Sequence, residues 1–179
     1  QFVGDKFIAS IKFINAETGY ASGSGGGIYK TVNGGANWTV LNSNSDWNFY
    51  SISVTDANNI YVIGELGNIL KSSNGGSSWS AFLHFTGRDY ITDIQAVNSS
   101  TVYAVGQNWI DHLFVTSNSG AVWDTIPIPF GHPDFLDFID AQTGWVGYGG
   151  LKLLRTSNRG VTWENKNVPS FPNADVRAI

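Results

Sequence analysis

The chain has 179 residues, of which 42% are hydrophobic and 13% are charged, and its formal net charge is -4. It is long enough to bury a core, and it has no basic excess that would hold a nucleic-acid backbone. Cysteine is absent, which excludes disulfide bonds and thiolate chemistry. No stretch approaches the roughly 18 apolar residues of a membrane-spanning helix. We therefore expect no nucleic-acid partner and no membrane span.

Four similar units follow one another along the chain, at about residues 8–42, 50–83, 91–126 and 134–167. Each reads as a short alternating strand, a polar turn, a β-branched or aromatic strand, a Gly-rich or polar loop, and a third strand. A fourth strand begins at a tryptophan. No stretch has a helical period over a useful length, so the sequence predicts an all-β fold.

Each unit ends in the pattern [ST]-x-N-x-G-x-x-W. The four copies read TVNGGANW, SSNGGSSW, TSNSGAVW and TSNRGVTW, and their asparagines lie 41, 44 and 40 residues apart. That period is the length of a four-stranded propeller blade. The sequence therefore predicts one β-propeller domain over residues 1–179, built from antiparallel four-stranded blades.

The repeated residues have turn chemistry. Ser, Thr and Asn side chains form hydrogen bonds with nearby backbone groups, glycine permits a left-handed conformation, and tryptophan can pack over the hairpin. We expect a structural role for the four sets, which are Thr31, Asn33, Gly35 and Trp38; Ser72, Asn74, Gly76 and Trp79; Thr116, Asn118, Gly120 and Trp123; and Thr156, Asn158, Gly160 and Trp163.

This pattern resembles the Asp-box, or BNR repeat, of form S-x-D-x-G-x-T-W. A stretch of sequence such as AETGYASGSGGGIYKTVNGGANW is similar to the photosystem II assembly and stability factor family of propellers. The resemblance covers essentially the whole chain. It implies that the box is a corner between the third and fourth strands of a blade, on the face away from the ligand. Here Asn replaces the box aspartate in all four copies, which argues against Ca²⁺ binding or catalysis there.

The segment Ala174 to Ile179 resembles the first strand of another unit. It either closes the ring on the first blade or begins further blades of a longer polypeptide. Four-bladed rings are at the small end of the known range, so we favour a larger propeller.

The non-repeating loops at the other end of the blades are the expected place for a ligand or partner. The candidate contact residues are Trp47, Arg88, Asp89, Trp109, Asp111, His112 and His132. Trp47 and Trp109 equally fit a role in capping the hydrophobic edge between blades. His84, His112 and His132 lack the short spacing of a zinc site, so we expect neither a metal nor a cofactor.

Two functions are compatible with the sequence. The first is a non-catalytic scaffold that binds a protein or a glycan through the loop face. The alternative is a carbohydrate-active propeller, sialidase-like or a glycanase, with catalytic groups partly outside this chain. The four arginines do not form a sialidase cluster, whereas the loop aspartates Asp46, Asp89, Asp111 and Asp134 leave a glycanase open. The low charge and abundant Asn, Ser and Thr suggest a secreted or cell-envelope protein, bacterial more than eukaryotic.

Overall fold

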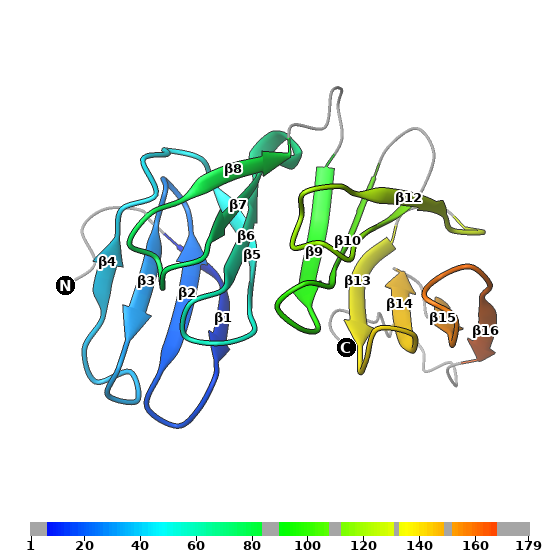
Figure 1. Ribbon diagram of the computed structural model, residues 1–179, viewed down its shortest axis with the longest axis horizontal. Helices are drawn as coiled ribbons and strands as arrows, with labels where there is room; N and C mark the ends of the chain where they lie inside the picture. The colour runs from blue at the N-terminus through cyan, green and yellow to red at the C-terminus, as the bar shows by residue number, and fades with distance from the viewer. Residues whose placement is uncertain (1–6, 84–89, 108–111, 131–132, 149–151, 168–179) are drawn as a thin grey trace. The chain divides into compact units, whose positions relative to one another are not determined.

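The computed structural model describes residues 7–83, 90–107, 112–130, 133–148 and 152–167 (Figure 1). The strands of these ranges form four antiparallel sheets of four strands each. The chain divides into two compact units, residues 1–87 and 88–179, and each unit contains two of the sheets. The expected strand at 174–179 lies outside the described residues. No helix in the described ranges is long and apolar enough to cross a membrane.

The first unit begins with a sheet of β1 (Ile8–Phe13), β2 (Gly19–Gly23), β3 (Ile28–Thr31) and β4 (Thr39–Leu41). Its second sheet contains β5 (Phe49–Val54), β6 (Ile60–Gly64), β7 (Ile69–Ser72) and β8 (Ser80–Leu83). A short 3₁₀ turn, η1 (Glu65–Gly67), follows β6. In both sheets the strands neighbour one another in chain order, so every connection is a local hairpin.

The second unit repeats this arrangement. Its first sheet contains β9 (Tyr90–Ala96), β10 (Val102–Gln107), β11 (His112–Thr116) and β12 (Asp124–Pro127). Its second sheet contains β13 (Pro133–Phe138), β14 (Gly144–Tyr148), β15 (Lys152–Thr156) and β16 (Glu164–Asn167). The prediction of an all-β fold built from four-stranded antiparallel propeller blades is confirmed within each unit.

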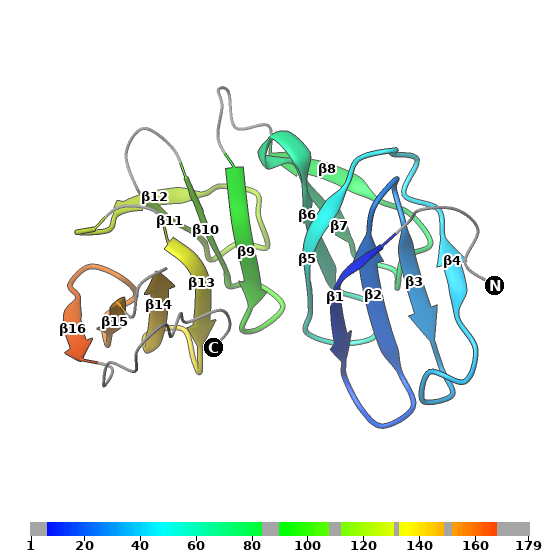
Figure 2. The ribbon, with the colours of Figure 1, turned by 180° about the vertical axis from the view of Figure 1, so that it is seen from behind.

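Each unit has a core between its two sheets. In the first unit Tyr20 and Ile28 pack with Phe49, Ile52 and Val62 in one buried cluster. The first strands of the two sheets, β1 and β5, lie side by side in Figure 1 and in Figure 2. Apolar residues on alternate positions of a strand point to one face of its sheet, so two facing sheets bury a continuous apolar layer.

The second unit has a similar core. Tyr103 and Leu113 pack with Leu136, Phe138 and Leu154. The rings of Tyr103 and Phe138 stack with their centroids 3.7 Å apart and an angle of 4° between their planes. This aromatic contact joins β10 of one sheet to β13 of the next.

Candidate functional site

The four motif turns have the same hydrogen bonds. In the first, the Thr31 hydroxyl donates to Asn33 Oδ1 at 3.0 Å and accepts from the Gly35 N–H at 2.9 Å, while Asn33 Oδ1 also accepts from the Asn37 N–H at 2.9 Å. The turns that begin at Ser72, Thr116 and Thr156 repeat all three bonds within 2.8–3.0 Å. The Ser or Thr and the Asn therefore close each turn.

Two successive residues of each motif turn have positive φ. The shared glycine has φ between 89° and 95° in all four copies, which only glycine adopts without strain. The residue before it has φ of 66°, 68°, 61° and 64°, at Gly34, Gly75, Ser119 and Arg159. Ser119 and Arg159 show that the position before the shared glycine accepts a side chain. The turn therefore requires glycine only at the shared position.

Each motif turn is attached to the turn between the first two strands of its own sheet. The Gly34 N–H donates to the Glu17 carbonyl at 2.9 Å, and the other three copies have the same bond at 2.8–3.0 Å. In these first turns an Asn or Asp side chain, at Asn15, Asp56, Asn98 and Asp140, accepts from two backbone N–H groups.

The two aspartates of these first turns, Asp56 and Asp140, have lowered pKa values. Hydrogen bonds from the Asn59 side chain and from backbone N–H groups lower the pKa of Asp56. Backbone N–H groups of Gln142 and Thr143 lower the pKa of Asp140. Such shifts reflect turn closure rather than catalysis, since both carboxylates accept the bonds of their own loop. The described residues contain no group of three or more His, Cys, Asp or Glu placed to bind a metal.

The opposite end of the first unit is built from three loops that hydrogen-bond to one another. The Gly26 N–H donates to the Trp47 carbonyl at 2.7 Å, and the Gly25 N–H donates to Asn48 Oδ1 at 3.0 Å. Asn48 Nδ2 donates to Glu65 Oε1 at 2.6 Å, which extends the network to η1. Antiparallel strands alternate in direction, so these loops lie at the end of the sheets opposite the motif turns (Figure 1).

A pocket of 280 Å³ lies beside these loops, and we call it the Trp47 pocket. Its lining residues are Ser43, Asn44, Ser45, Asp46, Trp47, Leu70, Trp79 and Ala81. The Trp47 indole is half-buried and packs against the core of the unit. The buried Trp79 Nε1 has no hydrogen-bond partner among the described residues. The Nε1 atoms of Trp123 and Trp163 in the second unit are likewise buried without a described partner, so this belongs to the repeated motif. The pocket itself offers apolar surface from Trp47, Leu70 and Ala81 beside polar side chains that include the exposed Asp46.

Of the seven residues predicted to bind a ligand or partner, the described ranges contain Trp47 and His112. Arg88, Asp89, Trp109, Asp111 and His132 lie outside them, as does His84. His112 begins β11 in the second unit, half-buried, with its ring centroid 6.2 Å from that of Phe114. Its Nδ1 is buried and has no partner among the described residues. Trp47 and His112 belong to different units.

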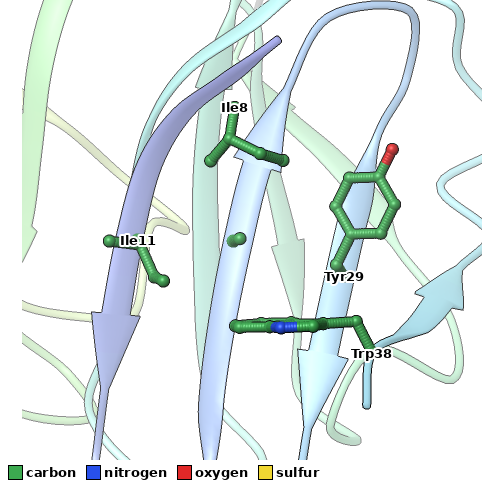
Figure 3. Close-up of a pocket in the computed structure, with 5 residues that line it drawn as sticks. Ile8, Ile11, Tyr29 and Trp38 are labelled. Atoms are coloured by element: carbon green, nitrogen blue, oxygen red, sulfur yellow. The ribbon is translucent and has the colours of Figure 1, made fainter. Parts of the chain in front are cut away.

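A second pocket, of 190 Å³, lies on the first sheet, and sequence reasoning did not find it. Its lining residues are Ile8, Ile11, Ala21, Tyr29 and Trp38 (Figure 3). They come from β1, β2 and β3 and from the residue just before β4, so they share one face of the sheet. The apolar positions of β1, which the sequence predicts as a short alternating strand, are the signal for this surface.

A family profile and two solved structures similar to this chain carry the same name, YCF48. A family profile described as "Photosynthesis system II assembly factor YCF48" matches residues 2–126. The structure described as "YCF48 bound to D1 peptide" is similar, with a TM-score of 0.72 and 21% identity over 91% of this chain. YCF48 from Cyanidioschyzon merolae has a TM-score of 0.73 and 16% identity over 99% of this chain. The comparison with curated proteins found no match.

Enzymes share the fold as well. The structure of an ancestral GH74 enzyme has a TM-score of 0.70 and 20% identity over 91% of this chain, which corresponds to 24% of the enzyme. The chain covers 54% and 61% of the two YCF48 structures, so it spans little more than half of their length. Likeness at these identities establishes the fold, and function has to be argued from the site.

Proposed function

From the premise that this chain belongs to the photosynthesis system II assembly factor YCF48 family, we propose that it is a non-catalytic interaction module that binds a segment of another protein. The observation that carries the proposal is the Trp47 pocket at the loop end of the first unit. A relative of the same fold has been seen with a D1 peptide, which supports a peptide as the ligand class.

The chemistry of the Trp47 pocket suits a peptide. Polar groups of the ligand backbone would form hydrogen bonds with the side chains of Asn44, Ser45 and Asp46, which line the pocket. An apolar ligand side chain would pack on the half-buried indole of Trp47 and on Leu70. Indole rings offer a large contact area at a low entropic cost, which is why tryptophan is frequent at binding hot spots.

The pocket is held in place before any ligand arrives. The Trp47 backbone both accepts from the Gly26 N–H and donates to Ser45 Oγ at 3.1 Å. Ser43 is buried, and its hydroxyl donates to the Gly26 carbonyl at 3.2 Å. Loops that are already ordered lose less entropy on binding than mobile ones, so this end can serve as a preformed docking surface.

Fluorescence anisotropy with a labelled D1 peptide and a panel of unrelated peptides tests the proposal. We expect the D1 peptide or a panel peptide to bind, with Trp47→Ala raising Kd about tenfold or more and Trp47→Phe raising it less. Trp38→Ala is the matched control, because Trp38 is a half-buried indole of the same unit beside a motif turn. Absence of binding by every peptide, or equal loss in both Ala variants, would contradict the proposal.

The carbohydrate-active alternative stays a prediction. Of the four loop aspartates, Asp89 and Asp111 lie outside the described residues, and Asp46 and Asp134 belong to different units. No described carboxylate pair therefore favours it. A hydrolysis screen on β-glucans, xyloglucan and sialosides, with Asp89→Ala and Asp111→Ala as test variants, would reveal such an activity. Glycan binding and a secreted or cell-envelope location likewise stay predictions, and a photosynthetic role is not carried over from the relatives.

A further inference from the structure

Two of the four motif turns contain the dipeptide Asn-Gly, at Asn33-Gly34 and Asn74-Gly75, and the sequence contains no other. In the second unit the motif asparagine is followed by Ser119 and by Arg159. The backbone nitrogen that follows an asparagine can attack the side-chain carbonyl carbon of that asparagine, and a side chain on the attacking residue hinders this step. Glycine has no side chain, so the two turns of the first unit place an asparagine before the least hindered nitrogen.

The backbone around this next residue is the same in all four turns. Its φ is 66° and 68° at the two glycines, and 61° and 64° at Ser119 and Arg159. In every copy its N–H donates to a carbonyl in the turn between the first two strands, at 2.8–3.0 Å. The chain therefore contains two test positions and two matched references, which differ in the side chain that follows the asparagine.

The motif turn prepares the side-chain carbonyl of its asparagine for attack. Asn74 Oδ1 accepts from the Ser72 hydroxyl and from the Ser78 N–H, each at 2.9 Å. Asn33 Oδ1 has the equivalent two donors. Attack on the carbonyl carbon develops negative charge on this oxygen, and hydrogen-bond donors already in place around it stabilise that charge.

The closed turn holds back the attacking nitrogen. The Gly75 N–H donates to the Asn58 carbonyl at 3.0 Å, and the Gly34 N–H donates to the Glu17 carbonyl at 2.9 Å. Attack therefore requires this one bond to break. Asn74 is exposed even though the first sheet packs against its own sheet, and exposed turns open at a smaller free-energy cost than the whole fold. Local opening of the turn then determines the rate of attack.

In the second unit the side chain after the asparagine also holds the turn closed. The Ser119 hydroxyl donates to the Ser99 carbonyl at 2.8 Å. Arg159 Nη2 and Asp124 Oδ2 are 3.9 Å apart, which adds a weaker attraction. Glycine can form neither contact. Both the shielding of the nitrogen and these contacts therefore favour attack in the first unit over attack in the second.

We propose that Asn33 and Asn74 are sites of spontaneous deamidation in the folded chain, and that Asn118 and Asn158 are not. The glycine nitrogen forms a bond to the side-chain carbonyl carbon, and the amide nitrogen leaves as ammonia with the proton of the attacking N–H. The product is a five-membered succinimide ring. Water then adds to one of its two carbonyls and opens the ring, which gives aspartate or isoaspartate. Water is the one co-reactant, and the reaction is independent of peptide binding at the loop end.

The two products have opposite effects on the turn. Aspartate keeps the acceptor oxygen that closes the turn, and each conversion adds one negative charge to a chain whose formal net charge is -4. Isoaspartate carries the main chain through the former side-chain carbonyl, so the main chain is longer by one carbon and that acceptor is lost. The motif turn should stay closed with aspartate and open with isoaspartate.

Peptide mapping by mass spectrometry compares all four motif asparagines in one sample. The folded chain is incubated in mildly alkaline buffer below its melting temperature, and aliquots are digested at intervals. We expect the two asparagines that precede glycine to be converted about tenfold faster or more than Asn118 and Asn158, because glycine leaves the attacking nitrogen unshielded. Electron-transfer fragmentation of the peptides distinguishes aspartate from isoaspartate.

Exchange of the next residue provides the matched control. Gly34→Ser should slow the conversion of Asn33 and leave that of Asn74 unchanged. Ser119 has a similar φ at the equivalent position, so the turn accepts this serine. In the reverse exchange, Ser119→Gly should make Asn118 react at a rate like that of Asn33.

A parallel incubation in urea separates the chemistry of the dipeptide from the effect of the turn. The proposal is overturned if Asn33 and Asn74 remain intact in the folded chain, and their conversion in urea would then show that the closed turn protects them. It is also overturned if all four asparagines react equally fast in the folded chain, or if Gly34→Ser leaves the rate at Asn33 unchanged. In both cases the residue after the asparagine does not determine the site.

Discussion

The Tyr20 hydroxyl reaches from one sheet to the next and donates to the carbonyl of Ala57 at 3.1 Å. The Tyr20 side chain is fully buried, and Ala57 lies in the turn between β5 and β6. Tyr103 and Ala141 have the same relationship in the second unit. Each tyrosine therefore fills the core with its ring and fixes the neighbouring sheet with its hydroxyl.

Removal of these hydroxyls should destabilise the chain without disturbing its packing. We expect Tyr20→Phe and Tyr103→Phe each to lower the free energy of unfolding by about 1 kcal/mol, since each leaves a carbonyl without its donor. Urea denaturation measures the change. Tyr29→Phe is the control, because Tyr29 is half-buried and its hydroxyl forms no comparable bond to another sheet among the described residues. Equal effects at all three positions would show that the hydrogen bond from the tyrosine hydroxyl to the next sheet does not contribute to stability.

The shared motif glycine should tolerate no side chain. Gly76 has φ of 89°, and a Cβ there would lie 2.3 Å from Leu41 Cδ1 of the preceding sheet. We expect Gly76→Ala to cost about 2 kcal/mol or more, from backbone strain and from overpacking. Gly34→Ser is the control, because Ser119 has a similar φ at the equivalent position, and it should cost less than about 1 kcal/mol. Chemical denaturation of both variants compares the two costs.

The sequence was sufficient to predict the strands and their order. Four copies of one motif at a nearly constant spacing determine the unit, and alternation within each unit determines its strands. The exposure of Ile11 could not be predicted in this way, because Ile11, Ile52 and Leu136 have the same sequence pattern and differ only in whether another sheet covers them. Local sequence specifies which face of a strand is apolar, whereas tertiary structure decides whether that face is covered.

The Trp47 pocket was only partly predictable. Trp47 stands outside the motif, which marked it as a candidate contact residue. Trp79 belongs to the repeated motif, for which the sequence predicts a structural role, yet it also lines the pocket. One residue can belong to a repeated turn and to a particular surface, and only the arrangement of neighbouring loops reveals the second role.

The motif asparagine should be replaceable by aspartate but not by alanine. Asn118 Oδ1 accepts from the Thr116 hydroxyl at 2.8 Å and from the Val122 N–H at 2.9 Å. Asn118→Ala removes the acceptor of both bonds, so we expect a loss of about 1–2 kcal/mol in the free energy of unfolding. Asn118→Asp keeps the oxygen and should cost less than half as much at neutral pH. Urea denaturation measures the loss of unfolding free energy in each variant. An equal loss in both would mean that the amide nitrogen of Asn118 contributes more to stability than its oxygen.

Acid should destabilise the chain through Asp56 and Asp140. Hydrogen bonds lower the pKa of each carboxyl in the folded state. The largest contribution comes from the Asn59 side chain at Asp56 and from the Gln142 N–H at Asp140. Their stabilising contribution is therefore complete above the unfolded pKa of about 4 and is lost as the pH falls through the lower folded pKa. Asn15 and Asn98 close the equivalent turns without a titrating group. The double variant Asp56→Asn and Asp140→Asn should accordingly have a melting temperature that depends less on pH below about 5. Thermal denaturation of the original and variant chains, followed by circular dichroism across that pH range, measures the difference. If the melting temperature of the variant depends on pH as steeply as before, other carboxylates cause the acid sensitivity.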